Sequence, residues 1–338
     1  MKSSTKHPKS SARDVQHPSA KSRSTDSLLA GQSMRCTSDK HRSAKPTPWK
    51  AIVAYFDLLG TSNRFPCNVS INQEIQEAQK LYSAMRAVRK ILENSGENNK
   101  VKWDSYTSSL LSDSVFMIRK LAPLPDNFEG DTTFVLDDIA QCQTELLKRG
   151  YVCRGGVDVG PVFFQRNFIC GSGLVSTHSL DCKGQGPFVF VPRRFVEFLY
   201  RASCRMKAQP TIDDFFLLDS DYDHRLIYLQ DSDRFVLNYM SEWYLEDDFE
   251  QLLDIQRQLI LDNLIRSRQD KRAREIYEML RCFHNYVLTL LDDRAVLDRF
   301  SIHEIDSQLF SPAKPAVQNI VETCDSITKQ SIAKKAAE

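Results

Sequence analysis

The feature that most constrains the fold is the apolar run Ala51–Leu59 (AIVAYFDLL), which is followed directly by Gly60. A run of this kind predicts a buried strand, and the glycine predicts a loop after it. Asp57 lies near the end of the run, where a lone carboxylate would be costly to bury. A strand-end Asp often caps the next segment, but it also suits a hard divalent cation. Asp57 alone leaves both interpretations open.

Strand and helix patterns alternate between residues 50 and 195. Apolar residues at helical spacing predict helices over Asn72–Leu92, Asp131–Arg149 and the middle of Gly171–Asp181. The other expected strands are Val101–Tyr106, Ser114–Arg119, Tyr151–Phe164 (as strand, turn and strand) and Phe188–Val191. The order β-α-β-β-α-β-β-α-β predicts an α+β fold with a ferredoxin-like core and additions. Polymerase palm domains and nucleotide cyclases share that core, so the fold alone fixes no activity.

The rest of the chain is expected to form tails and an extension. Residues 1–47 hold ten Lys/Arg and three Asp/Glu, a net of +7, with almost no large apolar residues. This composition predicts a disordered basic tail, either solubilising or partner-binding. The catalytic core is expected over 48–195. A hairpin and helices over 196–310 would pack on that core, and 311–338 would be mostly disordered.

Within that extension, two patterns are specific. The hairpin would turn at Asp231–Asp233, and two helices over 248–291 would be separated near Gln269 and Asp270.

Composition excludes several classes of protein. The 338 residues include 45 basic and 44 acidic side chains, a near balance that argues against nucleic acid as a partner. The nine cysteines show no zinc-ligand spacing, and no signal-peptide pattern precedes them, so a reduced cytoplasmic protein is the simplest expectation. The longest apolar runs are too short to span a bilayer.

A second acid, Asp113, changes the interpretation of Asp57. It stands in Leu110-Leu-Ser-Asp-Ser-Val-Phe-Met, a polar triplet between apolar residues. In a β-hairpin this Asp would be held at the turn, beside the first strand. Two carboxylates there would repel each other unless a cation lies between them. Two Mg²⁺ or Mn²⁺ ions, which prefer oxygen ligands and substrate phosphates, fit this requirement.

Arg154 is the third candidate, because it is a lone cation that begins an apolar, glycine-rich strand. A planar guanidinium can bind phosphate through two hydrogen bonds. The structural alternative is an ion pair with Asp158, which would face the same side of the strand. The sequence leaves both open.

Several blocks resemble, in order and spacing, the class III adenylyl/guanylyl cyclase homology domain, and especially its antiphage branch, the Pycsar pyrimidine nucleotide cyclases. The resemblance covers roughly residues 48–290. The blocks are Tyr55-Phe-Asp-Leu-Leu-Gly, Leu111-Ser-Asp-Ser-Val, Arg154-Gly-Gly-Val-Asp-Val-Gly, Gly171-Ser-Gly-Leu-Val-Ser-Thr-His-Ser-Leu-Asp, Asp231-Ser-Asp-Arg-Phe-Val-Leu-Asn-Tyr and Glu278-Met-Leu-Arg-Cys-Phe-His-Asn.

The resemblance implies a role for each matching residue. Asp57, the carbonyl of Leu58, and Asp113 would bind the two metal ions, and Arg154 would contact phosphate. The backbone N–H groups from Phe56 onward would surround the triphosphate; the residues concerned include Gly60, Thr61 and Ser62. The ribose 3′-hydroxyl would attack the α-phosphorus and expel pyrophosphate. Cyclases of this class place their sites between two protomers, which implies a homodimer.

The departures from the family pattern bear on the substrate. Purine cyclases carry an Asn and an Arg on the helix that matches Gly171–Asp181, but this chain has Val175 and Ser179 there. The resemblance therefore favours a uridylate cyclase of antiphage defence, whose product would act on a separate cyclic-nucleotide-sensing effector. The open alternatives are a cytidylate cyclase, a purine nucleotide cyclase and a catalytically silent nucleotide-binding or interaction module. The silent module is motivated by Ser176 and Ser179.

Three other features favour structural roles. His284 and Asn285 are expected in a core or interface, because they lie far in sequence from the other blocks. Gly171-Ser-Gly173 lacks the third glycine of a dinucleotide fingerprint. The three tryptophans are expected to fill the core.

Overall fold

Strand β1 (Trp49–Leu58) lies inside the sheet, and its apolar side chains are covered on both faces. Ile52, Ala54 and Phe56 join the large core, whereas Ala51 and Val53 join a smaller cluster on the opposite face. A central strand covered on both faces needs a nearly continuous apolar sequence. The run that predicted a buried strand is therefore confirmed.

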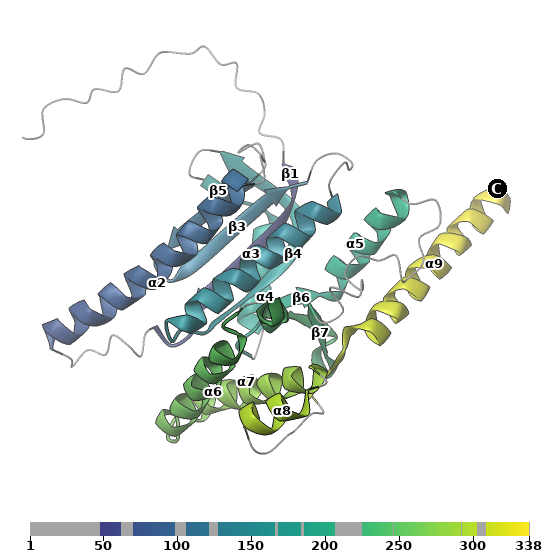
Figure 1. Ribbon diagram of the computed structural model, residues 1–338. Helices are drawn as coiled ribbons and strands as arrows, with labels where there is room; N and C mark the ends of the chain where they lie inside the picture. Colours follow the sequence, from purple (N-terminus) through teal and green to yellow (C-terminus); the bar gives the residue numbers. More distant parts are fainter. Residues whose placement is uncertain are drawn as a thin grey trace, which may run out of the picture. The chain divides into compact units, whose positions relative to one another are not determined.

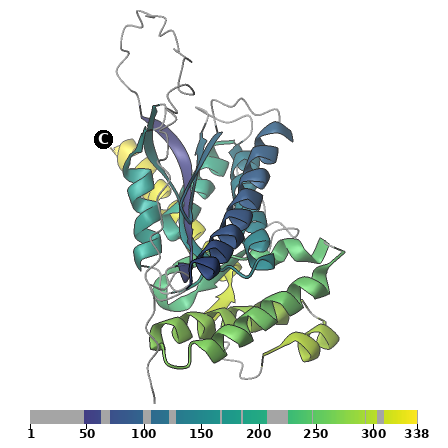
Figure 2. The ribbon, with the colours of Figure 1, turned by 90° about the vertical axis from the view of Figure 1, so that its left-hand side faces the viewer.

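The computed structural model (Figures 1 and 2) describes residues 48–61, 70–98, 106–121, 128–165, 168–183, 186–206, 225–245, 247–291, 293–302 and 309–337. All of them belong to one compact unit that begins at Pro46. The expected basic tail, residues 1–47, lies outside the described residues.

The elements alternate as the sequence predicts through the first half of the unit. They are β1, α2 (Ile71–Asn98), β2 (Tyr106–Leu111), β3 (Ser114–Lys120), α3 (Phe128–Lys148), β4 (Cys153–Gln165), β5 (Phe168–Cys170), α4 (Ser172–Lys183), β6 (Val189–Pro192) and α5 (Arg193–Met206). The second half contains β7 (Leu226–Leu229), β8 (Arg234–Leu237), α6 (Phe249–Arg266), α7 (Lys271–Leu290), α8 (Arg294–Phe300), β9 (Phe310–Pro312) and α9 (Ala313–Ala337).

The strand order confirms the ferredoxin-like core. The first four strands are arranged β2-β3-β1-β4, and all three neighbouring pairs are antiparallel. Helices α2 and α3 connect them, which gives the β-α-β-β-α-β pattern. Helix α4 lies against β1 and β4 on the face that carries Ala51 and Val53. That face also carries the odd-numbered β1 residues Tyr55 and Asp57.

The sheet then continues through β6, β8, β7 and β9, so the expected boundary at 195/196 divides one continuous sheet. Strand β6 pairs parallel with β4, and the β7–β8 hairpin turns at residues 230–232. The predicted hairpin and the two helices on either side of Gln269 and Asp270 are confirmed. The hairpin joins the core through β6 and extends its sheet.

Three sequence expectations require correction. The strand expected to end at Tyr106 continues to Leu111, because Leu111 pairs with Ser114 across a two-residue turn. Residues 101–105 lie outside the described part of the chain. Tyr151–Phe164 forms no strand–turn–strand unit but mostly one long strand, β4. Its glycines permit close packing, as described below, instead of producing a turn.

The third correction concerns the expected disorder over residues 311–338. Strand β9 pairs with β7, and α9 follows it directly. Val317, Ile320, Val321 and Cys324 are buried and share one face of the helix. This short stripe packs α9 near α5, where the Tyr200 hydroxyl donates to Asp325 Oδ1 at 3.2 Å.

Among the helices that the structure describes, none combines the length and apolar character needed to cross a membrane.

Candidate functional site

The end of β1 is tied to the β2–β3 turn. The Leu58 N–H donates to the Asp113 carbonyl at 3.1 Å, and Asp57 pairs in register with Ser114. Ser112 adopts a positive φ of 59°, which allows the hairpin to close in two residues. The chain therefore brings Asp57 and Asp113 to the same end of the sheet, as the sequence predicts.

Arg154 lies directly opposite Asp57 in the β1–β4 ladder. Its Nε is 3.4 Å from Asp57 Oδ1 and 3.0 Å from Asp181 Oδ1. The contact with Asp181 is an ion pair without hydrogen-bond geometry, since Asp181 Oδ1 has no hydrogen-bond partner among the described residues. Arg154 thus joins an acid at the end of β1 to an acid on α4.

The alternative partner for Arg154, Asp158, belongs to a different cluster. Asp158 is fully buried, and its Oδ2 accepts from Arg194 Nε at 2.9 Å. Ser176 on α4 also donates to Oδ2, while the Val159 N–H donates to Oδ1 at 2.8 Å. The Arg154–Asp158 pairing considered from the sequence is therefore wrong, because Arg194 on α5 and Ser176 already satisfy this carboxylate.

The cluster around Arg154 has too little positive charge. Among the described residues of this cluster, Asp57 and Asp181 share one guanidinium, that of Arg154, and the charge of Asp113 also acts on Asp57. Burial, followed by the charge of Asp181, raises the pKa of Asp57 to about 6, against the opposing influence of Arg154. Burial also raises the pKa of Asp181. Carboxylates that are close together and not fully neutralised are stabilised by a divalent cation, so this donor set fits Mg²⁺ or Mn²⁺.

The expected phosphate-binding segment is shorter than predicted. Phe56 is fully buried and pairs with Val115 on one side and Gly155 on the other, so its backbone groups belong to the ladder. The N–H of Leu58 donates to Asp113, and the N–H of Leu59 donates to Val152 O at 2.7 Å. The predicted role of the Phe56 amide is therefore wrong, because the sheet uses it.

The phosphate-binding role of the residues after β1 stays a prediction. Gly60 has a φ of 75°, which turns the chain sharply away from the strand. Thr61 Oγ1 donates to Asp113 Oδ2 at 2.5 Å and so orients this carboxylate. Ser62 lies outside the described residues.

Two glycines of β4 set the position of α4. A Cβ atom at Gly156 would lie 2.6 Å from Leu180 Cβ, and one at Gly160 would lie 2.8 Å from Gly173 Cα. Both distances are too short for any side chain, so only glycine lets the helix approach the sheet this closely. The helix can then place Asp181 beside Arg154 and Ser176 beside Asp158.

Asp181 is the residue that sequence reasoning missed as part of the site. It ends the Gly171–Asp181 block and is only 3% exposed. Its neighbours on α4, His178 and Cys182, place possible ligand atoms within 4.8 Å of one another and of an Asp181 oxygen. The available signal for Asp181 was an acid on a predicted helix that follows a glycine-rich strand. Its contact with Arg154, however, depends on tertiary packing.

The residues with expected structural roles behave as predicted. His284 is fully buried, with Nδ1 3.0 Å from Gln256 Oε1 and Nε2 3.1 Å from Phe300 O. Burial lowers the pKa of His284 to about 4. Asn285 binds both backbone groups of Ile302 across the same packed region.

The expectation for the tryptophans is confirmed at Trp243, which is fully buried. Trp49 is only half-buried, and Lys120 lies over its ring. Trp103 lies outside the described residues. Gly171, just before α4, has a φ of 146°, a conformation that favours glycine. This glycine therefore serves the backbone turn.

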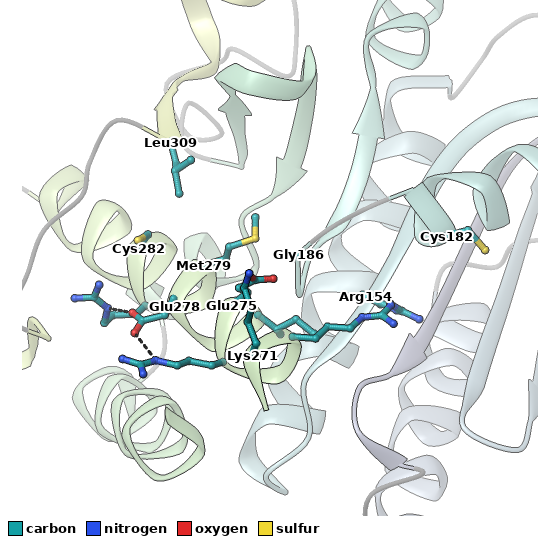
Figure 3. A pocket seen from close by; sticks show the side chains of 13 residues that line it. Arg154, Cys182, Gly186, Lys271, Glu275, Glu278, Met279, Cys282 and Leu309 are labelled. Atoms are coloured by element: carbon teal, nitrogen blue, oxygen red, sulfur yellow. Dashed lines mark hydrogen bonds and ion pairs between the residues drawn. The ribbon is translucent and has the colours of Figure 1, made fainter. Parts of the chain in front are cut away.

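A cavity of about 1050 Å³ adjoins the site and has Arg154 in its wall. Figure 3 shows Arg154 on the sheet side and Lys271, Glu275 and Glu278 on the α7 side. The other lining residues are Cys182, Gly186, Arg272, Arg274, Ile276, Met279, Arg281, Cys282 and Leu309. No local pattern in the sequence indicates that α7 lies near the site.

Comparison with known proteins gives limited similarity. No family model matches the chain, and no curated protein matches it. Among solved structures, the adenylyl cyclase CyaB from P. aeruginosa is similar with a TM-score of 0.36 and 11% identity, over 46% of this chain and 82% of that one. A bacterial light-regulated adenylyl cyclase has a TM-score of 0.35 and 10% identity, over 63% and 100%. The guanylyl cyclase Cya2 has a TM-score of 0.33 and 11% identity, over 45% and 79%. Similarity at this level establishes neither a fold nor an activity by itself.

Proposed function

We propose that the protein is a metal-dependent nucleotidyl cyclase. The observation that carries the proposal is the joining of Asp57 and Asp113 at one end of a ferredoxin-like sheet, with Arg154 directly opposite Asp57. This cluster contains hard oxygen donors, excess negative charge and a guanidinium. Such a set suits a substrate that brings both phosphates and divalent cations.

The donor set indicates how each group would act. Asp57, Asp113 and the Leu58 carbonyl would hold one or two Mg²⁺ or Mn²⁺ ions. Bound there, the ions would activate the 3′-hydroxyl and neutralise charge on the leaving pyrophosphate. Thr61 would keep the Asp113 carboxylate oriented, and Arg154 would bind a phosphate oxygen when substrate displaces its contacts with Asp57 and Asp181.

In the reaction, a bond would form between the ribose 3′-oxygen and the α-phosphorus. The bond from the α-phosphorus to the oxygen bridging to the β-phosphate would break, releasing diphosphate and a 3′,5′-cyclic monophosphate, while the 3′-hydroxyl proton would pass to solvent or to the leaving diphosphate. Intramolecular attack depends mainly on alignment and charge neutralisation, which a rigid strand end and fixed cations can provide.

The more specific proposal is a pyrimidine substrate, with UTP favoured over CTP, and a second messenger of antiphage defence. It rests on the family resemblance and on Val175 and Ser179, which replace the purine-cyclase Asn and Arg. Val175 is 66% exposed on α4, the helix that covers the site face, and this supports a homodimer that buries it. The expected partner of the product is a separate cyclic-nucleotide-sensing effector.

The test is incubation of the protein with each of the four nucleoside triphosphates and Mn²⁺ or Mg²⁺, followed by chromatography and mass spectrometry of the products. Cyclic UMP as the main product would support the full proposal. Cyclic AMP or cyclic GMP alone would overturn the pyrimidine assignment and keep the cyclase. No cyclic product from any substrate, with the fold intact, would overturn both.

A silent nucleotide-binding module is the second candidate, because Asp57 and Asp181 already engage Arg154. Equilibrium binding separates the two candidates: a silent module would bind nucleotide without forming product. A cyclase would lose product formation when Asp57 is changed to Asn.

A further inference from the structure

The cavity beside Arg154 has a strongly uneven charge. Its lining includes five basic side chains, Arg154 among them, and two acidic ones. Four of the basic residues come from α7, three of them from its first four residues, and α7 lies outside the ferredoxin-like core. The cavity therefore combines one cation of the candidate active site with a basic surface from a distant part of the sequence.

The α7 cations are only weakly engaged. Lys271 is 92% exposed and lies 3.8 Å from Glu275, and Arg274 Nε lies 3.7 Å from Glu278. Exposed pairs at such distances contribute little to stability, so a ligand can displace them easily. Arg281 differs, because its side chain is 12% exposed and its Nε is 2.7 Å from Glu278. Lys271 and Arg274 are thus cations that a ligand can recruit, while Arg281 is held in the wall.

The charge of the active-site cluster creates a need for these cations. Arg154 contacts Asp57 and Asp181, so its charge is already shared between two carboxylates. Divalent ions on Asp57 and Asp113 would offset part of this negative charge, but a phosphate chain that extends beyond them would need further cations close to it. The same cavity contains such cations on α7, and its volume of about 1050 Å³ is at the upper end of ordinary small-molecule pockets.

We infer that the basic face of α7 binds the phosphate chain of the nucleoside triphosphate, with Lys271 and Arg274 from the same protomer as Asp57. The inference rests on the proposed function, because it assigns the site to that reaction's substrate. Arg154 would lie at the border between the metal-binding carboxylates and this phosphate-binding surface. Ile276, Met279 and Leu309 form apolar wall and contribute no charge.

The test measures binding of 3′-deoxyuridine triphosphate, which cannot cyclise, by calorimetry with Mg²⁺ on the full chain. The double variant K271Q/R274Q should weaken binding about tenfold, because two charge contacts are lost. The control K80Q/R89Q removes the same charge from exposed ion pairs on α2, outside the cavity. It should change binding less than twofold.

A third variant gives an effect of opposite sign. Glu275 lines the cavity and is 62% exposed, so E275Q should strengthen binding about twofold by removing a like charge. A misfolded variant would not bind more tightly. Inorganic tripolyphosphate should displace the nucleotide analogue competitively. K271Q/R274Q should weaken the binding of both ligands.

The outcomes separate this inference from the proposed function. If a cyclic product forms but K271Q/R274Q leaves binding and KM unchanged, the α7 site is overturned and the cyclase stands. If the wild type binds the analogue through Lys271 and Arg274 but forms no product from any nucleotide, the site stands and the cyclase falls. Tripolyphosphate binding that does not compete with the analogue would indicate a separate phosphate ligand and would overturn the inference.

Discussion

Two charged clusters lie four residues apart on the same face of β4, and they differ in how fully they are neutralised. At Asp158 one buried carboxylate accepts from Arg194, Ser176 and the next backbone N–H. At Arg154 one guanidinium faces two carboxylates, with Asp113 close by. The first cluster is complete without a ligand, whereas the second carries excess negative charge near the end of a strand.

The comparison indicates which cluster is structural and which can bind a ligand. A buried carboxylate with all its partners in place holds elements together, here α4 and α5 against β4. A cluster that lacks positive charge gains most from a cation or a cationic surface. The same residue types in the same strand thus favour different roles, and mutations should separate activity from stability between them.

The largest expected effect is on catalysis at the Arg154 cluster. D57N or D113N should lower kcat at least about 1000-fold, or about 4 kcal/mol, because a ligand of the metal ions is lost. Stability should change little, since each change also removes a repelling charge. The measurement is product formation by chromatography, with thermal unfolding in parallel. The control is D254N on the exposed face of α6; a residual rate within tenfold of wild type would contradict the metal assignment.

The opposite behaviour is expected at the Asp158 cluster. R194A should lower the free energy of unfolding by about 3 kcal/mol, because Asp158 would remain buried without its cation. This is the low end for a buried pair, since the Arg194 side chain is 62% exposed. Denaturant unfolding measures the effect. R154A is the matched change. It should reduce product formation more than R194A does and lower the free energy of unfolding less. Equal losses of stability in the two variants would remove the distinction between the clusters.

The next largest effect should be a loss of both stability and activity, because α4 contributes residues to both clusters. G156A should destabilise the protein by about 2 kcal/mol, because the new Cβ would overlap Leu180 and push the helix away from the sheet. Product formation should fall as well, since α4 carries both Asp181 and Ser176. S179A on the same helix is the control and should change the free energy of unfolding by less than about 0.5 kcal/mol. If G156A unfolds like wild type, the close approach of α4 is not required.

The smallest expected effect is a shift in pH dependence. The charge of Asp181 helps to raise the pKa of Asp57 to about 6, so D181N should lower this pKa. Because Asp57 must be ionised to hold a cation, binding of Mn²⁺ weakens as the pH falls through that pKa. D181N should move the midpoint of this loss to lower pH by about one unit or less.

Mn²⁺ binding can be followed by electron paramagnetic resonance over roughly pH 5 to 8, the range around this pKa. The control D254N should leave the midpoint in place. An unchanged midpoint in D181N would mean that Asp181 does not act on Asp57 electrostatically.

Much of the core could be predicted because its signals are local. The run before Gly60, the helical spacing of the two crossover helices and the glycine-rich strand each depend on neighbouring residues. The convergence of Asp57 and Asp113 also follows from local facts: one ends a central strand, and the other sits in the adjacent turn. Phe56 failed as a phosphate ligand because a residue inside a two-sided ladder keeps no free N–H, and that depends on which strands flank it.

Other features depend on contacts between distant segments. The end of β2 is fixed by its pairing with β3, and α9 forms because four apolar residues pack on a surface near α5. Asp181 reaches Arg154 only because Gly156 and Gly160 admit α4. The basic face of α7 is more than one hundred residues from Arg154 in sequence, and no local pattern indicates that the two lie close together.

The ferredoxin-like order of elements and the acid pair at one end of the sheet follow from periodicity and turn chemistry, so they can be predicted from the sequence alone. The structural role of His284 was predictable from its distance along the chain from the other blocks. Which cation pairs with which acid depends instead on the tertiary structure. Arg154 and Arg194 are both able to neutralise a β4-facing carboxylate, and the choice between them depends on where α4 and α5 pack. That packing left Asp158 satisfied and the Asp57 cluster short of positive charge.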